Sequence, residues 1–217
     1  MKKKSVLLCM LLAAVLMAVT GCKGMTPDDA KVYVQSVLDA SYKADFDEYT
    51  KQTDSTEEEA QKLYEDNLDN IMELGGFTDA GVSEELVANY RSLFQDMLSK
   101  AVYEVGEARE DGDDGFVVNV SAEPFTAFEG LQDEVLAAVQ SEIEGITDVS
   151  QLPSEEQINE MVYQKMYDSL VQRVADPTYA EAQTVEIHVS PDKNNVYSIN
   201  EDDLTELDAV LFPSDNL

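Results

Sequence analysis

The sequence predicts an α+β fold in which helices pack against one antiparallel sheet built from two β-hairpins. Apolar residues recur at helical spacing in several long segments, whereas two other segments alternate apolar and polar residues on either side of a turn. No segment alternates strand, helix and strand, which disfavours a parallel sheet. Because a lone hairpin is only marginally stable, the two hairpins are expected to pair, with the helices on one face.

The first helices are predicted from their start signals. Thr26 and Pro27 are typical of a helix start, because threonine caps the first turn and proline suits the first helical position. A short helical turn is expected over residues 45–49. Ser55, with Glu58 three residues later, forms the pattern of a capping box and predicts a second helix from that point.

The middle of the chain changes from helix to strand. Gly75-Gly76 ends the second helix, and a third is expected from Ser83. Residues 102–109 and 116–123 then read as strands, and the turn residues 111–115 join them into a hairpin with one face inward.

A second round of helices and strands follows. Residues 128–143 predict a helix, and Ser154 with Gln157 forms a capping box for the next, which Asp176-Pro177 stops. Residues 184–199 predict the second hairpin, and residues 200–210 a short final helix.

The N-terminus has the layout of an export signal. Three lysines precede an apolar run over residues 5–20, which is shorter than the roughly 20 residues that a spanning helix needs. Val19-Thr20-Gly21-Cys22 resembles the lipobox of bacterial lipoproteins. That resemblance implies cleavage between Gly21 and Cys22 and attachment of lipid, with fatty acids such as palmitate, to Cys22. An uncleaved membrane anchor is the alternative.

This reading divides the chain into three parts. Residues 1–21 are expected to be a signal peptide, residues 22–26 a lipidated tether, and residues 27–217 a single extracytoplasmic domain held at the cell membrane by its lipid. The two cysteines are Cys9 and Cys22. The mature domain would therefore have no free thiol and no internal disulfide.

The chain is strongly acidic, with 14 Lys and Arg against 45 Asp and Glu. Three of the lysines lie in the expected signal, so the mature chain would have 11 bases against 45 acids, a net charge of −34. Such a surface repels phosphate backbones, which excludes nucleic acid as a partner. It attracts cations or basic partners, although keeping an exported protein soluble is the simpler role.

Residues 33–68 resemble a segment that recurs in cell-surface lipoproteins of Gram-positive bacteria carrying a domain of unknown function, most specifically over residues 38–60. The helix-then-hairpin order and the closing strand at residues 196–199 also resemble cystatin-like or NTF2-like domains. The resemblance implies no known activity and no catalytic residues. Two helices separate the hairpins here, unlike in such sheets, so the strand order is left open.

Few residues suggest a catalytic or metal-binding role. The one histidine, His188, is expected on the polar face of its strand beside Glu186, where it could bind a metal or move a proton, although an exposed polar residue is the simpler reading. Asp111 and Asp192 begin acidic stretches that lack the ligand spacing of a calcium loop and are expected to be turns. There is no nucleophile elbow and no glycine-rich phosphate loop, and no metal or cofactor is expected.

The leading functional hypothesis is a non-catalytic lipoprotein that binds an unidentified protein or small molecule, or supports an envelope complex. The alternative is a small extracellular enzyme with a carboxylate-based site in a helix–sheet cleft. A transporter's binding component is disfavoured because no βαβ pattern occurs. The lining of the main pocket, apolar or carboxylate-rich, separates the first two. Tyrosines could line a groove, although their spacing favours the core: Tyr33, Tyr42, Tyr49, Tyr64, Tyr90, Tyr163, Tyr167 and Tyr197.

Overall fold

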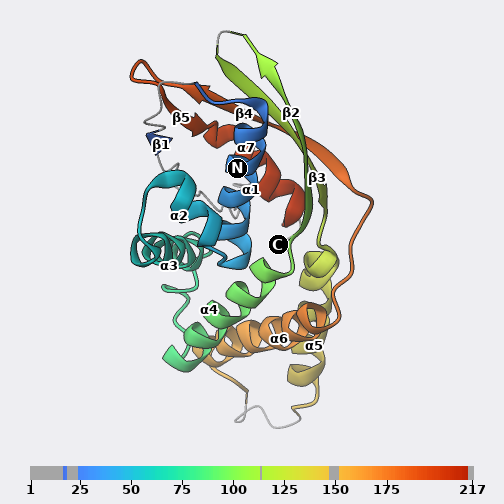
Figure 1. The fold of residues 1–217 in the computed structure, drawn as a ribbon. Helices are drawn as coiled ribbons and strands as arrows, with labels where there is room; N and C mark the ends of the chain where they lie inside the picture. The colour runs from blue at the N-terminus through green and yellow to red at the C-terminus, as the bar shows by residue number, and fades with distance from the viewer. Residues whose placement is uncertain (1–16, 19–23, 113, 147–151, 215–217) are drawn as a thin grey trace.

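The computed structural model describes residues 17–18, 24–112, 114–146 and 152–214 and shows the predicted α+β fold (Figure 1). The elements are, in chain order, β1 (Met17–Ala18), α1 (Pro27–Lys43), α2 (Asp47–Thr53), α3 (Glu57–Leu74), α4 (Glu84–Ser99), β2 (Val102–Asp111), β3 (Gly115–Glu123), the 3-10 turn η1 (Thr126–Phe128), α5 (Leu131–Glu144), α6 (Glu155–Ala175), β4 (Gln183–Pro191), β5 (Val196–Ile199) and α7 (Glu201–Leu211).

The two hairpins pair into one antiparallel sheet with the order β1-β5-β4-β3-β2. The central pair joins the hairpins, with Phe116 opposite Val189 and Ala122 opposite Gln183. The sequence left the strand order open. In the structure β3 and β4 are neighbours in the sheet, although α5 and α6 lie between them in the chain (Figure 1). The two-residue β1, which pairs with β5, falls in the segment expected to be a signal peptide.

Helices α1 and α7 cover the sheet. Helix α1 packs against β2 and β3, and α7 packs against β3 and β4. The strand residues beneath them are fully buried, as Val118, Val120 and Ile187 show. The Tyr42 hydroxyl of α1 donates a hydrogen bond of 2.5 Å to Asp208 of α7, which links the two helices.

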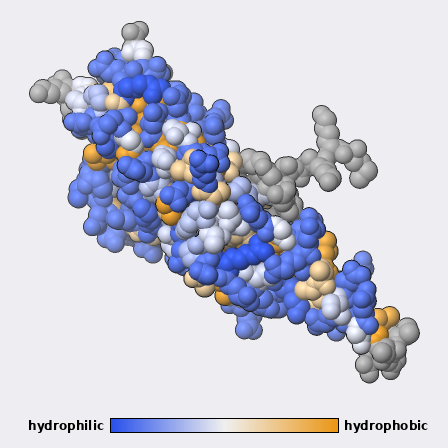
Figure 2. All heavy atoms as spheres, turned by 90° about the vertical axis from the view of Figure 1, so that its right-hand side faces the viewer, coloured by the Kyte–Doolittle hydropathy of each residue, from blue (hydrophilic) through white to orange (hydrophobic). Residues whose placement is uncertain are grey.

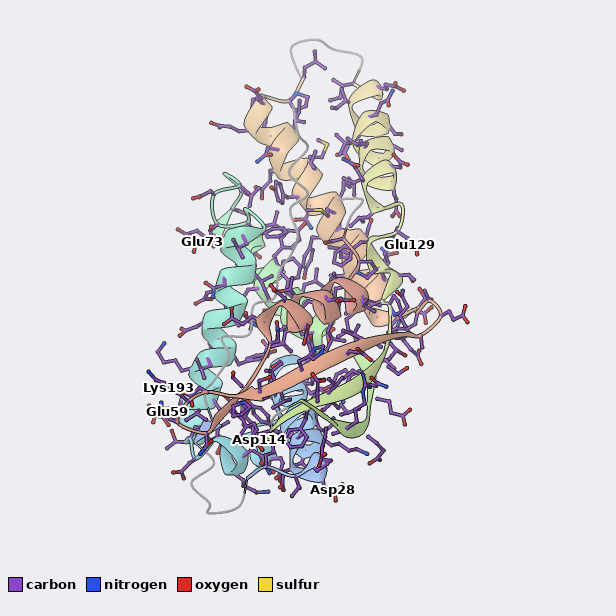
Figure 3. The ribbon with its side chains drawn as sticks, turned by 90° about the horizontal axis from the view of Figure 1, so that it is seen from above. Asp28, Glu59, Glu73, Asp114, Glu129 and Lys193 are labelled. Atoms are coloured by element: carbon purple, nitrogen blue, oxygen red, sulfur yellow. The ribbon has the colours of Figure 1, made fainter. Side chains whose placement is uncertain are left out.

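Helices α3 to α6 form a helical half that extends away from the sheet (Figures 1 and 3). Helix α6 packs against both α5 and α4, and α4 packs against α3. The buried side chains of both halves belong to one continuous hydrophobic core. On the face that Figure 2 shows, hydrophobic residues appear only as small areas within a hydrophilic surface.

Most predicted helix starts are confirmed, and one is shifted. Thr26, Ser83 and Ser154 each cap their helix as expected. The second helix is capped by Thr56 with Glu59, not by Ser55 with Glu58. The run of serine, threonine and three glutamates offers two overlapping frames, and the Ser55 hydroxyl instead lies 2.6 Å from that of Thr53. The predicted turn over residues 45–49 is the longer helix α2.

The first hairpin is longer and less regular than predicted. Strand β2 continues to Asp111, and its pairing with β3 shifts register between Val105 and Ala108. The turn follows at Gly112, whose φ of +65° suits glycine. The predicted turn at Asp192 is present, because its carboxylate accepts hydrogen bonds from the backbone N–H groups of Asn194 and Val196.

Candidate functional site

An apolar groove of about 340 Å³ lies in the helical half, where α5, α6 and α4 meet the connection between α3 and α4. This volume falls within the range of small-molecule sites. The groove is lined by Gly75, Phe77, Phe94, Phe128, Leu131, Gln132, Val135, Leu136, Val162, Tyr163, Met166, Leu170 and Ser214.

Aromatic rings form one wall of the groove. The Phe77 ring centroid lies 4.6 Å from that of Tyr90, 5.1 Å from that of Phe94 and 5.9 Å from that of Tyr163. The first pair is tilted and the other two are edge-to-face, and aromatic pairs prefer such separations and geometries to a face-to-face stack. The Tyr90 hydroxyl donates a hydrogen bond of 2.6 Å to the Tyr163 carbonyl, so it also fixes α4 against α6.

The end of α3 places Phe77 in this wall. Gly76 adopts a φ of +74°, its N–H bonds to the Glu73 carbonyl, and the Phe77 N–H bonds to the Met72 carbonyl. This pair of bonds is a Schellman motif, which turns the chain back over the helix end. A Cβ on Gly75 would lie 2.5 Å from the Phe77 ring, so the wall requires glycine there.

Polar bonds join α5 and α6 through side chains that do not line the groove. Glu134 accepts hydrogen bonds from Ser169 at 2.8 Å and from Arg173 at 2.5 Å, and these bonds lower the pKa of its carboxyl group. Lys165 lies 3.0 Å from Glu142. The two helices are therefore closed along one edge and line the groove with their other, apolar faces.

The groove lining formed by the described residues contains no Asp, Glu, His, Lys or Arg side chain. Its polar groups are the Gln132 amide, the Tyr163 hydroxyl and Ser214. Such a surface can bind apolar groups, and it offers no carboxylate, imidazole or amine for acid–base chemistry.

One carboxyl group is deeply buried, but it lies outside the groove. Asp208 is 3% exposed, and its second oxygen, Oδ2, has no hydrogen-bond partner among the described residues. Burial raises the pKa of Asp208 well above its ordinary value, and the Tyr42 hydrogen bond opposes that rise only in part. A second bond, from the Tyr103 hydroxyl to Asp39 at 2.6 Å, ties α1 to β2.

His188 lies on the polar strand face, and its partner comes from α7. Its Nδ1 lies 2.8 Å from Oδ2 of Asp203, which also accepts the His188 backbone N–H at 2.7 Å. The expected neighbour, Glu186, pairs instead with Arg109 at 2.6 Å. Asp203 thus satisfies the His188 backbone N–H, next to the part of β4 that pairs with β5, a role that strand alternation alone could not reveal.

Most of the tyrosines that were expected in the core are buried there. Six of the eight tyrosines are buried in the core, whereas Tyr163 and Tyr167 are half-buried and Tyr163 lines the groove. Cys22 and Gly21 lie outside the described residues, so cleavage and lipidation stay predictions. Within the described ranges, no group of three or more His, Cys, Asp or Glu side chains gathers as a metal site would require.

Sequence reasoning missed Phe77, although a signal was present. The Gly75-Gly76 pair marked the helix end, and a hydrophobic residue directly after such a pair commonly packs back against the helix.

No helix within the described ranges has both the length and the hydrophobicity needed to cross a bilayer.

Neither a protein-family model nor a curated protein matches the chain. The fold is similar to the crystal structure of a candidate lipoprotein, YcdA, from Bacillus subtilis, with a TM-score of 0.57 and 16% sequence identity. The match takes in 83% of this chain and 55% of the Bacillus chain, so this chain spans about half the length of that protein. At this identity, the likeness shows that the two proteins share a fold.

Proposed function

We propose that the chain is a lipid-anchored extracytoplasmic protein, held at the membrane through Cys22, that binds an apolar ligand in the groove of its helical half and does not catalyse a reaction. The observation that carries the binding role is the groove itself, which is lined by apolar and aromatic side chains with no charged group. The lipobox-like residues 19–22 and the fold shared with a candidate lipoprotein support the anchor.

The anchor and the groove would lie on different parts of the molecule. The expected tether lies by the sheet at Gly24, since a Cβ on Gly24 would be 3.7 Å from the Tyr197 hydroxyl. In Figure 3, Asp28 marks this end, and α5 and α6 extend toward the other. A lipid on Cys22 would therefore attach beside the sheet and leave the groove open to the surroundings.

The enzyme alternative rests on Asp208, which among the described residues is the one carboxyl group that is both buried and left with an unpartnered oxygen. Asp208 of α7 faces Tyr42 of α1 and does not line the groove. A substrate in the groove would not reach it, so binding without catalysis is the better-supported function.

The anchor is tested by labelling expressing cells with radioactive palmitate. Cys22→Ala should abolish incorporation and release the protein from the membrane fraction, because two acyl chains are needed for stable anchoring. Cys9→Ala is the matched control and should label as the wild type does. Full labelling of the Cys22→Ala variant would place the anchor elsewhere.

The groove is tested with a neutral fluorescent probe, N-phenyl-1-naphthylamine. Leu136 lines the groove and is 55% exposed, so Leu136→Asp should leave the fold intact and weaken binding about tenfold by placing a charge on an apolar contact. Val171→Asp, on an exposed α6 position outside the groove, is the control. Equal binding by both variants, or no binding by the wild type, would contradict the proposal.

A further inference from the structure

We infer that the groove selects amphiphiles by the charge of their head group, and that its ligand combines an aliphatic chain with a cationic head. This inference rests on the proposed function, since it names the class of ligand for the same groove. It follows from three features: the lining, the polar groups at the mouth and the distribution of charge around them.

The lining suits a hydrocarbon chain. The walls are aliphatic and aromatic, and a volume of about 340 Å³ is at the small end for ligand sites. Leu136, which lines the groove yet is 55% exposed, marks its mouth. Gln132 lies one helical turn before Leu136 on the same face of α5. A polar head group at the mouth would therefore meet the neutral, hydrogen-bonding amide of Gln132.

Three acids that lie next to lining residues in the chain have no counter-ions. Asp133 lies three positions before Leu136 on α5, so the two residues share a helix face at the mouth. Glu129 follows the lining residue Phe128, and Glu73 precedes the lining residue Gly75 by two positions. All three acids are exposed, and none lies within ion-pair distance of a basic side chain among the described residues. Figure 3 shows Glu73 and Glu129 on opposite flanks of the helical half.

The nearby bases are already neutralised. Helix α5 contains four acids and no base, and the two bases of α6, Lys165 and Arg173, bond to Glu142 and Glu134 along the closed edge. The potential at the mouth is therefore negative. It favours a cationic head, tolerates a neutral one and repels an anionic one.

The test compares three amphiphiles with the same ten-carbon tail: decyltrimethylammonium, decyl maltoside and decanoate. Each displaces N-phenyl-1-naphthylamine from the full chain in nanodiscs of neutral lipid, below its micelle concentration and with empty nanodiscs as the blank. At low salt, decyltrimethylammonium should bind about tenfold more tightly than decanoate, with decyl maltoside between them. The ratio should approach one near 1 M salt, where charges about 3 Å apart or more are screened.

A pair of variants isolates the head-group effect. Leu136→Lys should weaken decyltrimethylammonium and strengthen decanoate, whereas Val171→Lys adds the same charge away from the mouth and should leave the order unchanged. Equal binding of the three amphiphiles, or tightest binding of decanoate, would overturn this inference while displacement by decyl maltoside still upholds the groove. If none of the three displaces the probe, the proposed function itself fails.

Discussion

The buried interior of the sheet half, which is the sheet with α1 and α7, differs in polarity from the interior of the helical half. Between α1 and α7, above the sheet, a polar pair is sealed into the core: Tyr42 donates to Asp208, which is 3% exposed. Among α4, α5 and α6 the interior is aromatic and aliphatic and opens into a groove. Among the described residues, the one buried acid therefore lies in the sheet half, whereas the groove of the helical half is lined without charged side chains. The predictions below test this division.

The largest expected effect separates stability from binding. Phe77→Ala should destabilise the protein by about 3 kcal/mol, as the loss of a buried aromatic ring typically does, and should also weaken probe binding. Phe116→Ala in β3 should cost a similar amount but leave binding unchanged, because Phe116 lies in the sheet half. Urea unfolding and probe titration measure the two quantities. Equal loss of binding in both variants would mean that the halves are not separate.

The buried polar pair should be next in size. Tyr42→Phe removes the only donor to the Asp208 side chain among the described residues and should cost about 1–3 kcal/mol of unfolding free energy. Tyr167→Phe is the control, since no hydrogen bond of its hydroxyl occurs within the described ranges. A Tyr42→Phe variant as stable as the control would show that the bond contributes nothing.

The pH dependence of stability tests the same carboxyl group. Because the pKa of Asp208 is raised in the folded state, the folded protein holds a proton that the unfolded chain releases above a pKa of about 4. Its stabilising contribution is complete below that pH and is lost as the pH rises through the folded pKa, by up to about 1.4 kcal/mol per pH unit. Asp208→Asn should therefore gain stability relative to the wild type between pH 4 and pH 7. A constant difference across that range would contradict the raised pKa.

The smallest expected effect concerns the start of α3. Thr56→Ala should cost about 1 kcal/mol, because the Thr56 hydroxyl accepts the Glu59 N–H, whereas Ser55→Ala should cost less. Thermal unfolding of the two variants measures the difference. A larger loss of stability in Ser55→Ala than in Thr56→Ala would instead support Ser55 as the cap, as the sequence first suggested.

Local signals made the fold predictable from the sequence. The caps at Thr26, Ser83 and Ser154 and the hairpin turns depend on residues within about four positions of each other, so their chemistry is visible in a short window. The shift from Ser55 to Thr56 shows the limit of such reasoning, because two adjacent residues offered the same pattern and only the folded helix distinguishes them.

The candidate site was harder to predict because it depends on contacts between distant residues. Phe77 lines the groove only because α6, more than 80 positions later, packs Tyr163 against it. Asp208 was placed in a short final helix, and its burial depends on a donor from Tyr42, 166 positions away. Hydrophobic periodicity identifies which residues are buried but not which buried faces leave a gap between them.

Photolabelling tests the central claim most directly. A decyltrimethylammonium analogue carrying a diazirine at the end of its tail is irradiated with the full chain, and the modified peptides are identified by mass spectrometry. We expect labels on the groove walls, in residues 131–136 and 162–170 and at Phe77, that Leu136→Lys reduces and Val171→Lys does not. Labels confined to the sheet half, or labels on the groove walls that Leu136→Lys leaves unchanged, would contradict this expectation.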